Sequence, residues 1–444
     1  MNGLDEGAGL MAKLGKDRWI YSTFPISVAT GPLGTMVQLY LIQLNGQALG
    51  TIYGGLAAAF YNGISIPAAL FWGVTIDRVH KRKGLITLSY ALTAVALVSF
   101  YFDRSTGGTL ARYSVISFVS LASATPLNLL IMETEQKGRW AGAFAKLSLV
   151  SSLGNVVGLL VSVVWTDLLP SQLVLLFVPM GALSVTSSAL SVVMIREPEF
   201  VFERETVAGR RPSFFSRLLT NPIFFLTIPS LSDFRRAFRG IRSSLTRSVP
   251  LFYISTILFY ISSGLFNTSF VPAMHFFSIP DQQVFAVILA GMLIQTASFQ
   301  VAGRFVGDRN LVTTSVQGLL LRGWAYLGMG VAAIFFAGPF FVAPAILLYP
   351  VAGGLAFAIY YTSANTMMFT TVRSKSAGAA LGVYSAVVGI ASMAGSFVSG
   401  FISVYDGYFV TFILAGVFLF AAVVVIGRLP RPSSPEESAL LSSG

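Results

Sequence analysis

Two Asp-Arg pairs stand at the ends of long apolar segments, where charged side chains need a physical reason. In the first string, three residues separate Gly73 from Asp77 and Arg78, and a cluster of cations that includes Lys81 and Arg82 follows. A carboxylate at a helix end is well placed to bind the positive N-terminus of a second helix. Lys and Arg hold a loop on the cytoplasmic side of a membrane. The string therefore predicts a contact between helices at the inner membrane surface.

A weaker copy of this string, Gly303 with Asp308 and Arg309, begins 230 residues after the first. The tripeptide Ala-Gly-Ala recurs in the same way, at residues 141–143 and 377–379. Equivalent motifs separated by about half the chain indicate a six-helix unit that is used twice in parallel orientation. Two such halves around a site at the middle of the membrane are typical of alternating-access transporters.

Arg322 is the strongest candidate for chemistry inside the membrane, because it lies eleven residues into an apolar segment that begins at residue 311. Ionisable residues at such depth are costly and usually functional. We expect Arg322 to face a cavity or to pair with an acid or with backbone carbonyls, and snorkelling or a structural hydrogen bond is the alternative. Every Asp and Glu stands at a segment end, in a loop or in a tail, which argues against proton coupling by a carboxylate at mid-depth.

The sequence offers little for catalysis or for metal binding. It contains no Cys and two His, His80 and His275, which the predicted topology puts on opposite sides of the membrane. No cluster of metal ligands and no pairing of nucleophile and base appears, so we expect no metal and no cofactor. The string at residues 9–17 differs from a phosphate-binding loop in its glycine spacing, and Asp17 replaces the hydroxyl that would bind magnesium. A membrane-embedded enzyme and a channel stay as remote alternatives.

The composition places these residues in a membrane. The 444-residue chain is 55% hydrophobic and 11% charged, with a mean hydropathy of +0.75, whereas soluble domains carry about 25% charged residues. A spanning helix needs about 20 mostly apolar residues. We therefore predict an all-α integral membrane protein with twelve transmembrane helices in two pseudo-symmetric six-helix bundles. The segments are 20–43, 49–76, 84–102, 110–132, 139–166, 171–195, 249–275, 281–306, 311–336, 340–369, 376–404 and 407–428.

A polar, Arg-rich stretch divides the twelve segments six and six. The predicted parts are an N-terminal bundle at 1–195, a basic cytoplasmic linker with an amphipathic surface helix at 196–248, a C-terminal bundle at 249–430, and a disordered cytoplasmic tail at 431–444. Lys and Arg gather on one predicted side of the membrane, which places both termini and the linker in the cytoplasm. The same asymmetry accounts for the net charge of +11 without nucleic acid.

The string from Gly73 to the basic cluster resembles the signature between helices 2 and 3 of the major facilitator superfamily. The weaker copy, the twelve segments and the long central linker extend the resemblance over essentially the whole chain. It implies that Asp77 meets the N-terminus of the eleventh helix, and Asp308 that of the fifth, when the cytoplasmic side is closed. The junction of Glu133 and Arg139 is similar to that of the drug-exporting branch, which assigns both residues to the inner gate. A plain solvated turn is the alternative.

The same resemblance implies roles for polar and small residues inside the helices. Gly154, Asn155 and Gly158 are similar to the glycine motif of antiporters in the fifth helix, and simple helix packing is the alternative. Helices 1, 4, 7 and 10 line the cavity in this fold, and binding between neighbouring helices is the alternative for each polar residue. The residues expected to line the cavity with Arg322 are Gln38, Asn128, Asn267, Tyr361 and Asn365.

These features predict a secondary active transporter in the plasma membrane. The leading hypothesis is efflux of amphiphilic molecules or drugs, and the alternative is uptake or exchange of a polar metabolite such as a sugar or organic anion. A cavity lined by Phe and Met would favour the first, and one lined by Arg322 with converging amides the second. Protons are the candidate coupling ion, through Asp77, Glu133 or His275, unless coupling is absent. We expect a monomer whose partners are a small-molecule substrate and the lipid bilayer.

Overall fold

The computed structural model describes residues 18–78, 82–134, 140–170, 172–195, 248–307, 310–371 and 377–429. Within these residues every regular element is a helix, as the apolar segments predict. The predicted linker and the C-terminal tail fall almost entirely outside the described residues.

The N-terminal half contains eight helical elements in its described residues. In chain order they are η1 (Arg18–Ser22), α2 (Thr23–Thr30), α3 (Leu33–Asn45), α4 (Gln47–Arg78), α5 (Arg82–Phe102), α6 (Thr106–Thr134), α7 (Trp140–Leu168) and α8 (Leu173–Met194).

The C-terminal half follows the same plan, with its fourth segment divided. Its elements are α11 (Ser248–Phe276), α12 (Asp281–Gly307), α13 (Leu311–Phe335), η4 (Gly338–Phe341), α14 (Val342–Tyr349), the π-helical turn η5 (Pro350–Ala356), α15 (Phe357–Thr371), α16 (Ala377–Tyr405) and α17 (Tyr408–Ile426).

Eleven segments in the described residues are long and apolar enough to cross a membrane. The first predicted segment is not among them, because the chain bends at Gly31 and Pro32 and leaves two shorter helices, α2 and α3. Pro32 has no N–H group to continue the helical ladder. A Cβ at Gly31 would lie 2.6 Å from the Cα atom of Asn155, so only glycine lets α7 approach the bend.

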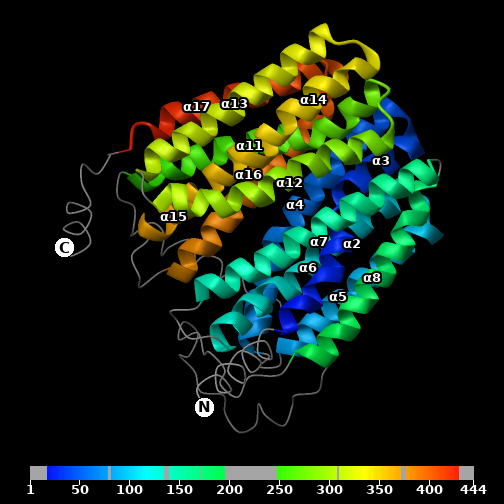
Figure 1. Ribbon diagram of the computed structural model, residues 1–444, viewed down its shortest axis with the longest axis vertical. Helices are drawn as coiled ribbons and strands as arrows, with labels where there is room; N and C mark the ends of the chain where they lie inside the picture. Colours follow the sequence, from blue (N-terminus) through cyan, green and yellow to red (C-terminus); the bar gives the residue numbers. More distant parts are fainter. Residues whose placement is uncertain are drawn as a thin grey trace, which may run out of the picture.

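The two halves form separate groups of helices (Figure 1), with residues 18–195 in blue to green and residues 248–429 in green to red. Equivalent helices pack together in each half: α5 lies on α8 as α13 lies on α17, and α2 lies on α7 as α11 lies on α16. The repeat that the motifs indicate is therefore also a repeat of packing.

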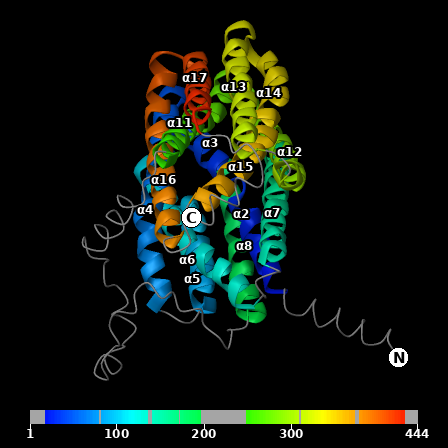
Figure 2. The same ribbon diagram turned by 90° about the vertical axis from the view of Figure 1, so that its left-hand side faces the viewer.

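The halves meet along two helix pairs, α4 with α16 and α7 with α12, which flank the centre of the molecule in Figure 2. Small residues bring the first pair close together. A Cβ on Gly55 would lie 3.0 Å from the Ser396 carbonyl oxygen, and one on Gly400 would lie 3.0 Å from the Ile52 Cα atom. In a bilayer such close approach replaces the hydrophobic effect as the source of helix association, and it leaves room for a cavity between the pairs.

Candidate functional site

A cavity of about 430 Å³ lies between the two halves. Helices α3, α4 and α6 contribute its N-terminal wall, and α11, α12, α13, α15 and α16 contribute most of its C-terminal wall. Among the described residues, its lining includes amides, hydroxyls, two phenylalanines and one cation, but no methionine and no acidic side chain. The lining side chains that can form hydrogen bonds are Thr35, Gln38, Tyr61, Asn62, Tyr113, Tyr260, Ser263, Asn267, Thr268, Arg322, Tyr349, Ser392 and Ser396.

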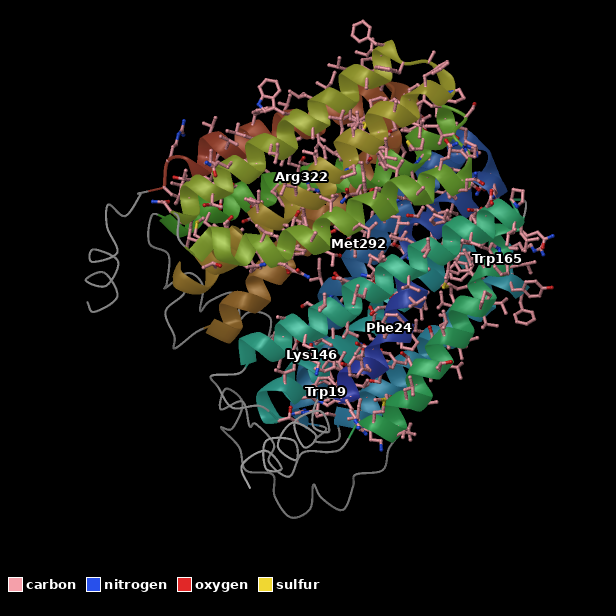
Figure 3. The ribbon with its side chains drawn as sticks, viewed as in Figure 1. Trp19, Phe24, Lys146, Trp165, Met292 and Arg322 are labelled. Atoms are coloured by element: carbon pink, nitrogen blue, oxygen red, sulfur yellow. The ribbon has the colours of Figure 1, made fainter. Side chains whose placement is uncertain are left out.

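Arg322 is the charged residue of this lining, on α13 in the C-terminal half (Figure 3). Its side chain is 2% exposed, and its Nε donates a hydrogen bond of 2.7 Å to the Tyr326 hydroxyl. Its guanidinium carbon lies 4.8 Å from the ring centre of Phe259 and 5.2 Å from those of Tyr326 and Phe357. Nη1 is buried and has no hydrogen-bond partner among the described residues. Aromatic rings therefore hold the cation in place and leave part of its hydrogen-bonding capacity unused.

Gln38 brings the complementary group from the N-terminal half. Its Oε1 atom is buried and accepts no hydrogen bond from the described residues, although the side chain lines the cavity. Asn267 lines the cavity from α11, one helical turn beyond Ser263, and Tyr260 lies one helical turn before Ser263. The i, i+3 and i+7 spacing of these three residues puts them on one helix face, a pattern that is visible in the sequence.

Three of the residues expected in the lining are not among those that line this cavity: Asn128, Tyr361 and Asn365. Asn128 lies fifteen residues beyond Tyr113 on α6, so the rise of the helix carries it about 22 Å further along. Tyr361 is 40% exposed and stacks on Phe357 with ring centres 5.3 Å apart. Tyr361 and Asn365 lie four and eight residues beyond Phe357, which lines the cavity from the start of α15, so the rise of the helix carries them about 6 and 12 Å further along.

The sequence reasoning also missed part of the wall. Asn62 and Tyr61 of α4, together with Tyr113, contribute to the lining, and the rings of Tyr61 and Tyr113 stack with centres 4.4 Å apart. Neither α4 nor α13 belongs to the helices that the resemblance assigns to the cavity. The sequence signal for this part of the wall was a polar residue, Asn62, inside an apolar segment.

The glycine motif of α7 serves close helix packing in this structure. A Cβ at Gly158 would collide with the carbonyl oxygen of Val28 and would lie 2.9 Å from the Cδ atom of Pro32. A Cβ at Gly154 would lie 2.8 Å from the carbonyl oxygen of Phe24. Both glycines therefore let α7 lie against the backbone of the first segment.

The predicted inner-gate residues are described only in part. Among the residues that the structure describes, no atom lies within 4 Å of a Cβ built at Gly73. Arg82 is buried and its Nη1 donates a hydrogen bond of 2.6 Å to the carbonyl oxygen of Ile76, within the same half. Gly303 belongs to α12. The side chains of Asp77, Arg78 and Glu133, and the whole of Lys81, Arg139, Asp308 and Arg309, lie outside what the structure describes.

A second group of polar side chains joins the halves at the ends of α3, α4, α11, α12 and α17. We call this the outer end, following the predicted orientation, and we call the group the outer cluster. Its members are Gln43, Gln47, Thr51, His275, Asp281 and Tyr408.

Gln47 is the centre of the outer cluster. Its Nε2 donates to the Tyr408 hydroxyl at 2.7 Å and to the Pro272 carbonyl oxygen at 2.8 Å, and its Oε1 lies 2.8 Å from Nδ1 of His275. Thr51 also bonds to Tyr408, over 2.9 Å. Every hydrogen bond between the halves that the structure describes involves a member of this cluster, so these bonds hold the halves together at the outer end.

No family model and no curated protein sequence matches the chain. Solved structures match it in fold. A mutant of the nucleoside transporter NupG is 13% identical, over 93% of this chain and 99% of that chain, with a TM-score of 0.69. A POT family transporter in complex with a thioalcohol-conjugated peptide is 12% identical, over 93% and 94%, with a TM-score of 0.72.

The xylose transporter XylE from E. coli, in an inward open conformation, is 13% identical over 97% of this chain and 99% of that chain, with a TM-score of 0.65. At these identities the likeness shows the fold. It is the major facilitator fold that the sequence motifs predict, and the matches do not single out the drug-exporting branch.

Proposed function

We propose that this protein is a secondary transporter that moves a small polar organic solute across the membrane by alternating access. The observation that carries the proposal is a polar cavity between two similar halves. Hydrogen bonds join these halves at the outer end. A site between two repeats of one unit can face either side when the halves rock against each other. The solved structures of similar fold are, by their names, also transporters.

The outer cluster has the chemistry of a closure that can be reversed. Its bonds are neutral or partly exposed contacts, and a hydrogen bond of this kind contributes about 0.5–1.5 kcal/mol net. A few such bonds bias one state over another by a few kcal/mol, which is the range in which a ligand can shift the balance between them.

The lining of the cavity favours a polar substrate over an amphiphilic drug. Arg322 and three amides, Gln38, Asn62 and Asn267, converge on it, while its apolar rings are two phenylalanines and no methionine takes part. A buried amide with no partner costs free energy, and an apolar ligand would not restore its hydrogen bonds. Because Arg322 and converging amides line the cavity, this geometry supports uptake or exchange of a polar metabolite. Efflux of an amphiphile becomes the competing outcome of the test.

A proton is the candidate coupling ion. Of the three groups considered for it, His275 has described contacts, and it bonds to Gln47 across the halves. Protonation of His275 would therefore act on the closure of the outer end. We further propose that both termini lie in the cytoplasm, since Lys and Arg gather on that predicted side of the membrane. We also propose that the protein is a monomer of the plasma membrane.

Transport in reconstituted liposomes tests the proposal. The panel contains neutral sugars, small organic anions and lipophilic cations, each measured as saturable flux and as exchange stimulated by solute on the opposite side. We expect saturable exchange of a polar solute. Flux restricted to lipophilic cations would replace the proposal by efflux of amphiphiles, and unsaturable current would indicate a channel.

A crosslink at the outer cluster tests the alternating-access mechanism separately. The chain has no Cys, so the double variant Gln43→Cys with Asp281→Cys carries one reactive pair, at side chains that now bond over 3.3 Å. A short reducible bifunctional thiosulfonate should abolish flux, and reduction should restore it. Each single-cysteine variant is the matched control, because it accepts the reagent without joining the halves. Undiminished flux in the crosslinked protein would refute alternating access.

A further inference from the structure

We infer that the central cavity binds a hydroxylated organic monoanion, with its anionic group on Arg322 and a hydroxyl donor on Gln38. The inference rests on the proposed function for the meaning of the cavity, and it names the substrate class of that site.

The first step concerns the charge of the cavity. An arginine stays protonated at any pH a cell reaches, and Arg322 is 2% exposed. No carboxylate lies within salt-bridge distance of it in the part of the chain the structure describes, where the one ion pair joins Arg112 and Asp103. The described residues of the lining include no acidic side chain. A bound monoanion would therefore bring the cavity close to neutrality, whereas a cation would add an uncompensated like charge.

The second step concerns the unused donor. The described structure gives the Arg322 guanidinium one hydrogen bond, from Nε to Tyr326, and the buried Nη1 makes none. Cation–π contacts hold the guanidinium over three rings but accept none of its N–H groups in a hydrogen bond. A buried donor without a partner is costly, and a carboxylate or similar oxyanion is the acceptor that best fits a guanidinium. The unpaired nitrogen therefore points to an oxyanion.

The third step concerns the opposite wall. Oε1 of Gln38 is buried and unpaired, and it needs a donor from the ligand. A hydroxyl supplies that donor without adding a charge. An ammonium group would make the ligand a net-neutral zwitterion, which leaves the charge of Arg322 uncompensated. The two orphan atoms lie in different halves, so a ligand that bonds to both would couple substrate binding to the relative position of the halves.

Binding to the purified full-length protein tests this assignment. The probes are D-gluconate, its neutral amide gluconamide, benzoate as an anion without hydroxyls, and choline as a cation, with thermal stabilisation and calorimetry as readouts. Because hydrogen bonds to charged groups are the stronger ones, we expect gluconate to bind at least about tenfold more tightly than gluconamide. We also expect it to bind more tightly than benzoate, and choline not to bind.

Variants locate the two contacts. Arg322→Gln should remove the preference for gluconate over gluconamide, and Arg322→Lys should keep the preference at lower affinity. Arg428→Gln, a neutralisation at an exposed arginine outside the cavity, is the matched control and should change neither. If Arg322→Gln does not fold, Gln38→Glu keeps the arginine but adds the missing negative charge, and it should abolish gluconate binding.

The outcomes separate this inference from the proposed function. Equal binding of gluconate and gluconamide, equal binding of benzoate and gluconate, or no binding by any carboxylate of the panel would overturn the inference. A retained preference in Arg322→Gln would do the same. Saturable exchange of neutral sugars with no anion preference would overturn it while the transport proposal stands. Anion binding that depends on Arg322 without any flux in liposomes would support the inference and refute transport.

Discussion

Removing the side-chain hydrogen bonds of Gln47 should open the outer end of the protein. The substitution Gln47→Met keeps the length of the side chain and deletes three bonds between the halves, to Tyr408, Pro272 and His275. At about 0.5–1.5 kcal/mol for each bond, the outward-closed state loses about 1.5–4.5 kcal/mol. Gln47 is half-buried, so water replaces part of the loss, and the lower end of this range is expected. That corresponds to about a tenfold shift toward the outward-open state.

A single cysteine inside the cavity measures this shift. Thr268 lines the cavity on α11 and is 3% exposed, and the chain has no native Cys, so Thr268→Cys gives one reporter. A membrane-impermeant maleimide applied from the outer side should label it about tenfold faster when Gln47→Met is also present. Thr51 and Gln43 keep their bonds to the other half, which sets an upper limit to the opening.

The matched control is Gln283→Met, the same change at the outer end of α12, where the glutamine side chain makes no described hydrogen bond across the halves. It should leave the labelling rate of the Thr268→Cys reporter unchanged. Equal labelling of the reporter with and without Gln47→Met would show that the outer cluster does not hold the outer end closed.

Three further outcomes are expected. Tyr326→Phe leaves Nε of Arg322 without its acceptor and should lower the free energy of unfolding by about 1–3 kcal/mol; an unchanged thermal midpoint would show that the guanidinium finds another partner. Gly158→Ala should lower that midpoint clearly, because its Cβ meets the backbone of the first segment, while Gly142→Ala on the same helix meets nothing within 4 Å and should not. Hydrogen bonds from Ser105, and then the charge of Arg112, lower the pKa of Asp103 in the α5–α6 loop. The ionised Asp103 carboxylate therefore stabilises the folded state above its unfolded-state pKa of about 4. This contribution is lost as the pH falls through the folded-state pKa. Asp103→Asn should therefore flatten the acid limb of a plot of thermal midpoint against pH, and an identical limb would show that Asp103 has no part in it.

The amino-acid sequence was sufficient to predict the all-helical architecture of this protein. In a bilayer every backbone polar group must bond within its own segment, so long apolar runs can only become helices. The repeat of the Gly73 string around Gly303 indicated two similar halves, and the structure shows equivalent helix packing in both. That Arg322 would face a cavity could also be predicted, because the cost of burying a charge depends on its depth in the membrane, which the position in the apolar segment indicates.

Which side chains contact one another depends on how the helices pack, and the sequence alone did not reveal it. The outer cluster joins Gln47 to Tyr408, which are separated by 361 residues, and no local pattern specifies such a pair. Tyr361 and Asn365 share a helix with Phe357 of the cavity lining but lie further along its axis, and the sequence does not show how far along each helix the cavity extends. Helical periodicity fixes a face only relative to its own axis, and the packing of several helices sets which faces surround a cavity.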